Sequence, residues 1–214
     1  MLGVPGAGKG TQAARMADRF ALPHVSTGEI FRQAAAQGSE LGRAVKGYLD
    51  AGKLVPDELT SRVVDEMVVT KLDGYILDGY PRTLQQARDL DRMLGRRGQK
   101  LDAVVYFRLE DGEAVKRLTG RLVCSACGEN YHRDFMPPRR DSVCDKCGGP
   151  LTARSDSTED VVTKRLAEYQ EKTKPLVAFY QARGLVAEVD ASASPAEVAQ
   201  RTEAVLERMV PSLR

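Results

Sequence analysis

Several features that define other protein classes are scarce in this sequence. It has no tryptophan, 6% aromatic residues and two histidines, His24 and His132, in 214 residues. A lone histidine is usually a packing or surface residue, so neither is assigned to catalysis. No apolar run approaches the about 18–20 residues of a membrane helix, and no signal-peptide pattern precedes the first glycine-rich run. We therefore expect a soluble, cytoplasmic protein with no membrane partner.

A large excess of charge of one sign is also missing. Lys and Arg number 32 against 30 Asp and Glu, a formal net charge of +2. A general polyanion binder would show a basic stripe, so we expect no nucleic-acid partner. Hydrophobic residues make up 42% of the chain, which is enough for a sizeable core and excludes wholesale disorder. The length predicts one substantial domain, or a core with smaller inserts.

Cysteine is absent except in one short stretch. Cys124-x-x-Cys127 and Cys144-x-x-Cys147 are separated by 16 residues, the spacing of a four-cysteine zinc ribbon. Four protein ligands leave the ion no open position, so such a zinc is structural. Two disulfides or a redox dithiol are the alternative, which the lack of a secretion signal disfavours.

Short apolar runs alternate with amphipathic stretches along the chain, the pattern of an α/β protein with a parallel sheet. The expected strands are His24–Val25, Tyr75–Asp78, Ala103–Phe107 and Val186–Val189. The expected helices are Gly8–Phe20, Gly28–Gln37, Leu41–Ala51, Asp57–Lys71, Thr83–Arg97, Asp111–Arg121, Glu159–Arg183 and Pro195–Met209. Pro175 should kink the helix that contains it, and Ser194 should cap the last helix, with Pro195 in its first position.

The run Gly3-Val4-Pro5-Gly6-Ala7-Gly8-Lys9-Gly10-Thr11 is typical of a phosphate-binding loop. Glycines let main-chain N–H groups surround an anion, and Lys9 adds a charge near the β- and γ-phosphates. Gly10 stands where Ser or Thr would bind Mg²⁺, and the hydroxyl comes one place later, at Thr11. A plain glycine-rich turn is the alternative. Only Met1 and Leu2 precede Gly3, so we expect the strand before the loop to be nearly absent and the core weaker there.

Three segments resemble the adenylate kinase family. They are the loop variant Gly-x-Pro-Gly-x-Gly-Lys-Gly-Thr, the segment Ser26-Thr27-Gly28-Glu29-Ile30-Phe31-Arg32, and Tyr75-Ile76-Leu77-Asp78-Gly79-Tyr80-Pro81-Arg82, with Gln86 four residues later. The resemblance covers essentially the whole chain apart from the first strand. It implies the reaction MgATP + AMP = 2 ADP by direct in-line transfer, and many members of this family carry a lid with four metal-binding cysteines.

The resemblance also implies a fold. It is a five-stranded parallel sheet of the P-loop NTPase type, flanked by helices and carrying two mobile inserts. The core would comprise residues 1–25, 56–119 and 158–214, the AMP-binding insert residues 26–55, and the lid residues 120–157. Residues 26–55 and 122–153 do not fit the alternating pattern of the core, which agrees with this division.

Residue roles follow from the resemblance position by position. ATP would be held by Gly6, Ala7, Gly8, Lys9, Gly10, Thr11, Arg117, Arg121, Asn130, Tyr131 and Ala193. AMP would be held by Thr27, Arg32, Lys53, Leu54, Val55, Gly79, Tyr80, Pro81, Arg82, Gln86, Arg154 and Arg165. The catalytic set would be Lys9, Asp78, Arg82, Arg121, Arg154 and Arg165, with Asp78 meeting Mg²⁺ through water. Cys124, Cys127, Cys144 and Cys147 would hold Zn²⁺.

The arginines make physical sense for this reaction, because phosphoryl transfer spreads negative charge over oxygens that guanidinium forks grip. The four catalytic arginines come from separate segments and would converge when the lid closes. Asp78 ends an apolar strand, where ligand sites of parallel sheets lie. Where many members of the family have Arg-x-Asp-Asp, this chain has Ser157 in the last place, which leaves the pairing at the lid hinge open.

Two other functions are alternatives to an adenylate kinase. A kinase for GMP, UMP or CMP is the nearest alternative, although the amide of Gln86 suits an adenine edge. A zinc-ribbon nucleic-acid module joined to an NTPase would need unbalanced positive charge, which residues 121–154 lack. Nothing in the sequence requires more than a monomer acting on ATP, AMP and ADP.

Overall fold

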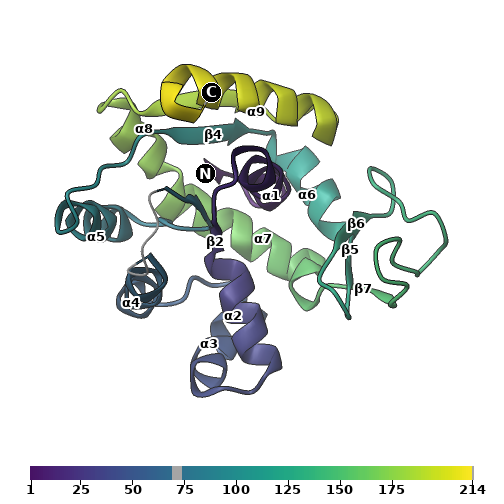
Figure 1. Cartoon of the computed structure of the whole chain (residues 1–214). Helices are drawn as coiled ribbons and strands as arrows, with labels where there is room; N and C mark the ends of the chain where they lie inside the picture. The colour runs from purple at the N-terminus through teal and green to yellow at the C-terminus, as the bar shows by residue number, and fades with distance from the viewer. Residues whose placement is uncertain (69–73, 214) are drawn as a thin grey trace.

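The computed structural model describes residues 1–68 and 74–213. Helices and short strands alternate, which confirms the α/β class (Figure 1). The elements are β1 (Leu2–Gly3), α1 (Lys9–Phe20), β2 (His24–Ser26), α2 (Thr27–Ala36), α3 (Glu40–Asp50), α4 (Asp57–Val68), β3 (Ile76–Asp78), α5 (Leu84–Gly95), β4 (Val104–Arg108), α6 (Asp111–Thr119), β5 (Arg121–Cys124), β6 (Asn130–His132), β7 (Leu151–Ala153), η1 (Ser155–Ser157), α7 (Glu159–Glu168), η2 (Tyr169–Thr173), α8 (Pro175–Gln181), β8 (Val186–Asp190), α9 (Pro195–Met209) and η3 (Pro211–Leu213). The expected helix over 57–71 is confirmed as far as Val68, and its last residues lie outside the described ranges.

The central strands are parallel but form two ladders rather than the expected five-stranded sheet. One ladder has the order β1-β4-β8, and the other pairs β2 with β3. The physical reason is the length of β1, whose two residues pair with Tyr106 and Phe107 of β4. On its other side, the Met1 amine donates to the Leu77 carbonyl of β3 at 2.8 Å. A cavity separates β3 from β4 beside Met1, so the short first strand is confirmed and the continuous sheet is not found in the described residues.

Alternate side chains of the strands enter the cores on opposite faces. On β3, Ile76 packs with Ala13 and Met16 of α1, whereas Leu77 packs with Leu90 of α5. Helices α1 and α9 therefore cover one face, and α4, α5 and α8 cover the other (Figure 1). Because the strands within each ladder run parallel, the residues that follow them lie at the same edge of that ladder.

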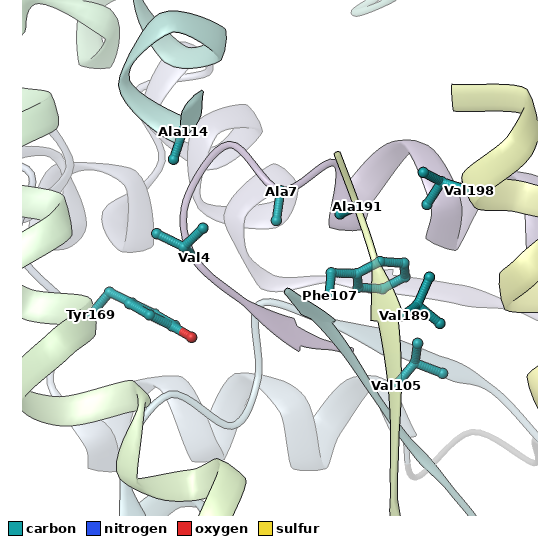
Figure 2. Close-up of a cluster of buried hydrophobic side chains, with 9 residues drawn as sticks. All are labelled: Val4, Ala7, Val105, Phe107, Ala114, Tyr169, Val189, Ala191 and Val198. Carbon is teal, nitrogen blue, oxygen red and sulfur yellow. The ribbon is translucent and has the colours of Figure 1, made fainter. Parts of the chain in front are cut away.

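A third cluster of buried apolar side chains packs against the phosphate loop. Val4 and Ala7 of the loop pack with Phe107 of β4, Val189 of β8 and Tyr169 of η2, as Figure 2 shows. Phe107 is fully buried. The loop therefore rests on a packed apolar floor, which restricts the movement of its main chain.

Two excursions leave this core, at separate places in Figure 1. Helices α2 and α3 pack against each other through Phe31 and Val45. Strands β5, β6 and β7 form a three-stranded antiparallel sheet with β5 in the centre. These strands were missed by the sequence reasoning, because each has three or four residues, too few for a recognisable period. The expected helix ending at Arg121 instead ends at Thr119, and Arg121 begins β5.

The expected long helix over 159–183 is interrupted, as Pro175 predicts. Helix α7 passes into the π-helical turn η2, in which Lys174 donates its N–H to the Tyr169 carbonyl, and α8 begins at Pro175. At the start of α9, Ser194 and Glu197 form a capping box, which confirms the expected cap. Within the described residues, no helix is long and apolar enough to cross a membrane.

Candidate active site

The phosphate loop surrounds a half-buried lysine. The Lys9 ammonium donates to the Gly3 and Val4 carbonyls at 2.7 and 3.0 Å, so it lies folded across its own loop. Gly6 and Gly8 have φ angles of +91° and +82°, which side chains disfavour. Burial lowers the pKa of Lys9 to about 7, because the attraction of Asp78 does not offset burial and the nearby arginines. An anion bound beside Lys9 would raise its pKa and keep the ammonium charged, so the site favours anion binding.

Asp78 lies at the end of β3, close to the start of α1. Ser26 Oγ donates to its Oδ2 at 3.2 Å, and His24 Nε2 lies 3.6 Å from the same oxygen. Burial alone would raise the pKa of Asp78, but His24, Lys9 and the Met1 amine together hold it at about 2. A β-carbon on Gly10 would lie 3.2 Å from Asp78 Oδ2. A larger residue at position 10 would therefore crowd this carboxylate.

A pocket opens at the ends of β2 and β3, next to the loop. It is lined by ten of the twelve residues expected to hold AMP: Thr27, Arg32, Lys53, Leu54, Val55, Gly79, Pro81, Arg82, Gln86 and Arg165. Lys9 lines it too, and so do Phe31, Thr60 and Asp156, which the sequence reasoning did not select. The pocket thus joins the phosphate loop to the segment around α2 and α3.

Gly79 allows a close approach within this pocket. Its carbonyl accepts from Thr27 Oγ1 at 2.9 Å and from Arg82 Nε at 2.8 Å. Its φ is +79°, and a β-carbon there would lie 2.9 Å from both Thr27 Oγ1 and Arg82 Nη2. A side chain at this position would displace the Arg82 guanidinium.

Tyr80 does not line the pocket with its side chain. The ring is fully buried and packs with Val64 and Leu90 on the far face of β3. Its hydroxyl donates to the Gln86 carbonyl at 3.1 Å and lies 3.0 Å from Ser61 Oγ. Burial raises the pKa of Tyr80 far above its ordinary value. Gly79 and Pro81, its neighbours in the chain, line the pocket. The Tyr80 ring anchors this segment in the core on the other side of β3.

Gln86 has a fixed orientation at the pocket wall. Its Oε1 accepts from the Arg82 main-chain N–H at 2.7 Å, and its Nε2 donates to Asp57 Oδ1 at 2.8 Å. Asp57 Oδ2 accepts from Thr83 Oγ1 at 2.7 Å. Gln86 is 2% exposed, so these bonds are shielded from water. Asp57 was missed by the sequence reasoning, because it is 29 residues from Gln86 in the chain.

Several arginines gather around the carboxylate of Asp156, which lines the pocket. Asp156 accepts from Arg154 at 2.9 and 2.5 Å and from Arg165 at 2.8 Å. Burial works to raise the pKa of Asp156, but these arginines and Arg121 lower it. Ser157, its neighbour, is buried with no hydrogen-bond partner for its Oγ among the described residues. Within η1, Asp156 therefore pairs with both arginines, and its neighbour at position 157 is a serine in place of a second carboxylate.

Burial and mutual repulsion lower the pKa values of the arginines near this carboxylate. Burial and the repulsion of Arg154 and Arg165 lower the pKa of Arg121 to about 9. Burial and Arg154 lower the pKa of Arg32 to about 10. The structure thus brings together positive charges from α2, from the segment after β3, from β5 and from α7. Clustered positive charges repel one another, which raises the free energy of the site unless anions are bound. Phosphate groups are anions that guanidinium groups bind well.

Arg117 lies on α6, beside the loop that precedes α9. It donates to the Ala191 and Ser192 carbonyls at 2.8 and 3.2 Å and pairs with Glu113 at 3.1 Å. Its guanidinium lies 5.6 Å from the centre of the Phe135 ring. Ala193 is the next residue of that loop. The Arg117 guanidinium therefore lies within cation–π range of an aromatic ring.

Asn130 and Tyr131, both expected to bind ATP, lie on β6. Asn130 is exposed, and its Nδ2 donates to the Gly128 carbonyl at 3.5 Å. The Tyr131 side chain is buried inside the small sheet, where its hydroxyl accepts from the Asp145 N–H at 2.8 Å. Any contact of Tyr131 with a nucleotide would therefore come from its main chain.

The four cysteines form one cluster. Their Sγ atoms all lie within 4.8 Å of one another. Cys124 and Cys147 are 3.5 Å apart, and Cys127 and Cys144 are 3.6 Å apart. A disulfide would place its sulfurs at about 2.05 Å, whereas a tetrahedral zinc with bonds of about 2.3 Å separates them by about 3.8 Å. The donor set and spacing fit zinc.

Each Cys-x-x-Cys turn has the same main-chain design. Gly128 donates its N–H to the Cys124 carbonyl at 2.9 Å, and Gly148 donates to the Cys144 carbonyl at 2.9 Å. Their φ angles are +76° and +74°, where glycine is favoured. The two turns therefore share the same local main-chain geometry after their first cysteine.

Comparison with known proteins agrees with this geometry. The family model described as "Adenylate kinase" matches residues 1–185. A protein of Moorella thermoacetica named adenylate kinase is 48% identical over 194 residues, which cover 90% of this chain and 89% of that protein.

Two further relatives carry the same name. The protein of Caldanaerobacter subterraneus subsp. tengcongensis is 46% identical over 200 residues, covering 92% of this chain and 90% of its own length. The protein of Archaeoglobus fulgidus is 44% identical over 210 residues, covering 97% of each chain.

Proposed function

The chain belongs to the adenylate kinase family, and from this premise we propose how its residues carry out the family's reaction. The reaction is the reversible transfer MgATP + AMP = 2 ADP. The single observation that carries the assignment is the pocket that joins Lys9 of the phosphate loop to Arg82, Arg165 and Gln86. One cavity then holds the phosphates, the transferring group and the acceptor base.

ATP binds on the side of α1 and the lid. Main-chain N–H groups from Gly6 to Thr11 surround its phosphates, and Lys9 leaves the Gly3 and Val4 carbonyls to reach them. Arg117 stacks on the adenine, beside Ala193, and Asn130 and Tyr131 border the nucleotide from β6. The low pKa of Lys9 supports this assignment, since phosphates would compensate for the burial of its charge.

AMP binds in the pocket between the loop and α2. Thr27, Gly79, Tyr80 and Pro81 shape the phosphate end, the last two through main chain and packing. Arg32 and Arg82 hold the phosphate. Residues 53–55 and Gln86 border the base, where the amide meets both a donor and an acceptor on adenine.

Phosphoryl transfer requires positively charged groups that stabilise the transition state, and it proceeds without a covalent intermediate. Arg82, Arg121, Arg154 and Arg165 stabilise the charge that spreads over the transferring phosphoryl group, and Lys9 spans the β- and γ-phosphates. No general base is assigned. Arginine keeps its charge when desolvated, which lysine does less well. The mutual repulsion of these groups supports a role with bound phosphates.

Two metals take part when bound. Asp78, ionised because its pKa is near 2, would face Mg²⁺ through water, and the ion would neutralise the phosphates of ATP. Cys124, Cys127, Cys144 and Cys147 would hold Zn²⁺, which would join two segments of the lid. The closed set of sulfurs supports a structural role.

The division of the chain follows from these roles. Residues 26–55 form the AMP-binding insert and residues 120–157 the lid, both mobile on a core of residues 1–25, 56–119 and 158–214. The core sheet acts as one five-stranded parallel scaffold in spite of the break beside Met1. We assign the protein to the cytoplasm as a monomer.

A nucleotide panel tests the substrate assignment. ATP is incubated with AMP, GMP, UMP, CMP or water, and the phosphorylated products are measured. AMP should react far faster than the others, because Gln86 and residues 53–55 face the base. Comparable rates with any pyrimidine monophosphate would show that the acceptor site is wrongly assigned, and phosphate release with water alone would indicate an NTPase.

A further inference from the structure

We propose that Asp57 determines base selectivity by locking the amide of Gln86 in one orientation. The inference rests on the proposed binding of the acceptor base at Gln86. Asp57 does not line the pocket and touches no substrate in this scheme. It acts through Gln86 as a positioning residue for purines that carry a 6-amino group.

The orientation of the amide follows from its two partners. A main-chain N–H is always a donor, so the Gln86 atom that faces Arg82 N at 2.7 Å must be the oxygen. A carboxylate is always an acceptor, so the atom that faces Asp57 Oδ1 at 2.8 Å must be the nitrogen. Rotating the amide by half a turn would place oxygen against oxygen and N–H against N–H. Both hydrogen bonds would become repulsions inside a shielded site.

Asp57 is itself held so that it cannot turn away. Its second oxygen accepts from Thr83 Oγ1 at 2.7 Å, and Thr83 is the N-cap residue of α5, the helix that carries Gln86. The Thr83 hydroxyl also accepts from the Gln86 N–H at 3.1 Å. Asp57 at the start of α4 thus joins α4 to both ends of the turn that carries Gln86.

The locked amide has one bonding position left on each atom. An amide oxygen accepts two hydrogen bonds and its nitrogen donates two, and one of each is used by the described partners. Adenine offers a 6-amino donor beside a ring-nitrogen acceptor, which matches the free oxygen and the free N–H. Hypoxanthine and guanine offer a 6-oxo acceptor beside an N1–H donor. They would need the amide in the opposite orientation.

The lock therefore excludes 6-oxo purines by repulsion as well as favouring adenine by attraction. Without the charge of Asp57, one of the two barriers to rotation is removed. Asparagine at position 57 would accept from the original amide nitrogen or donate to a rotated amide oxygen. The remaining barrier is the Arg82 N–H.

The test compares AMP with IMP, which differs from it at the 6-position and N1, in the full-length protein at saturating MgATP. For D57N, we expect the ratio of kcat/KM for AMP to that for IMP to fall about tenfold or more. The change should come from a higher KM for AMP and a lower KM for IMP. The kcat with AMP and the KM for ATP should stay within about twofold, because the arginines and the phosphate loop are untouched.

A matched control is E58Q, which removes an exposed charge from the same first turn of α4. It should keep the wild-type ratio. If D57N folds poorly by circular dichroism, D57S serves instead, since serine also donates or accepts and suits a helix start. A folded variant with the wild-type AMP/IMP ratio overturns the role of Asp57. Wild-type protein that uses IMP as well as AMP overturns the assignment of Gln86 itself.

Discussion

The Arg165 guanidinium of α7 donates to the carboxylate of Asp156 in η1 at 2.8 Å, within a half-buried site. Arg154 donates to the same carboxylate, so two of the proposed phosphoryl-binding groups share one partner. Arg32, Arg82 and Arg121 are also close enough for Asp156 to raise their pKa values. Asp156 therefore supplies negative charge to the same arginines that are proposed to bind phosphates.

We expect D156N to lower the melting temperature of the ligand-free protein at pH 7. The arginines would lose a shared negative partner, at a cost of about 1–3 kcal/mol for a group of this exposure. The pKa of Asp156 is lower in the fold than in the unfolded chain. Its stabilisation is therefore present above the unfolded pKa, near pH 4, and is lost as the pH falls through the lower folded value.

Calorimetry across this pH range measures the effect, with D160N as control because Asp160 is exposed on α7. ADP should stabilise D156N more than it stabilises the wild type, since phosphate oxygens replace the missing carboxylate. Equal melting temperatures for D156N and wild type at pH 7 would show that the arginines do not depend on this partner.

R82A should lower kcat by about 100- to 1000-fold. Its guanidinium is half-buried at the pocket, lies among the other arginines, and makes one hydrogen bond within the described residues, to the Gly79 carbonyl. The main-chain bond from residue 82 to Gln86 remains in the variant, so circular dichroism should stay native. R88A, which removes an exposed arginine from α5, is the control. Near-normal turnover in folded R82A would remove Arg82 from the catalytic set.

Binding of MgATP should take up a proton above pH 7. Lys9 has a pKa of about 7 in the free protein, and phosphates that surround it would raise that value. At pH 8 a mostly neutral Lys9 must therefore become charged, so affinity should weaken as the pH rises. Titration calorimetry in two buffers of different ionisation enthalpy measures the uptake, with K9M as the reference. The same uptake by wild type and K9M would place the titrating group elsewhere.

Removal of zinc, or the substitution C144S, should lower the melting temperature and loosen the lid. The lid core is small, with Leu151 and Tyr131 beside the buried cysteines, so metal binding supplies much of its folding free energy. Activity at low temperature should largely survive, because the arginines and the phosphate loop remain. Metal analysis of the intact protein should find about one zinc per chain.

S125A, which changes an exposed residue between Cys124 and Cys127 in the other Cys-x-x-Cys turn, is the control for C144S. Metal-free protein that keeps its thermal stability and loses all phosphoryl transfer would contradict the structural role and make the ion catalytic.

Local motifs determined much of this protein by themselves. The glycines of the phosphate loop, the two Cys-x-x-Cys turns and the Ser194 cap act within a few residues, so their spacing specifies their geometry. The family resemblance selected ten residues that line the pocket. Helix positions followed from the amphipathic period, and the break before Pro175 from the missing N–H of proline.

Tertiary structure decided what depends on partners far apart in the chain. Asp57 and Gln86 meet only because α4 packs beside α5, and the amide orientation follows from that meeting. Arg32 and Arg121 come close to Asp156, and Tyr80 packs with Val64 in the core while its neighbours face the pocket. The two-residue β1 leaves the parallel strands in two ladders. Hydrogen bonds and charges act through space, so these relationships exist only once packing has brought the segments together.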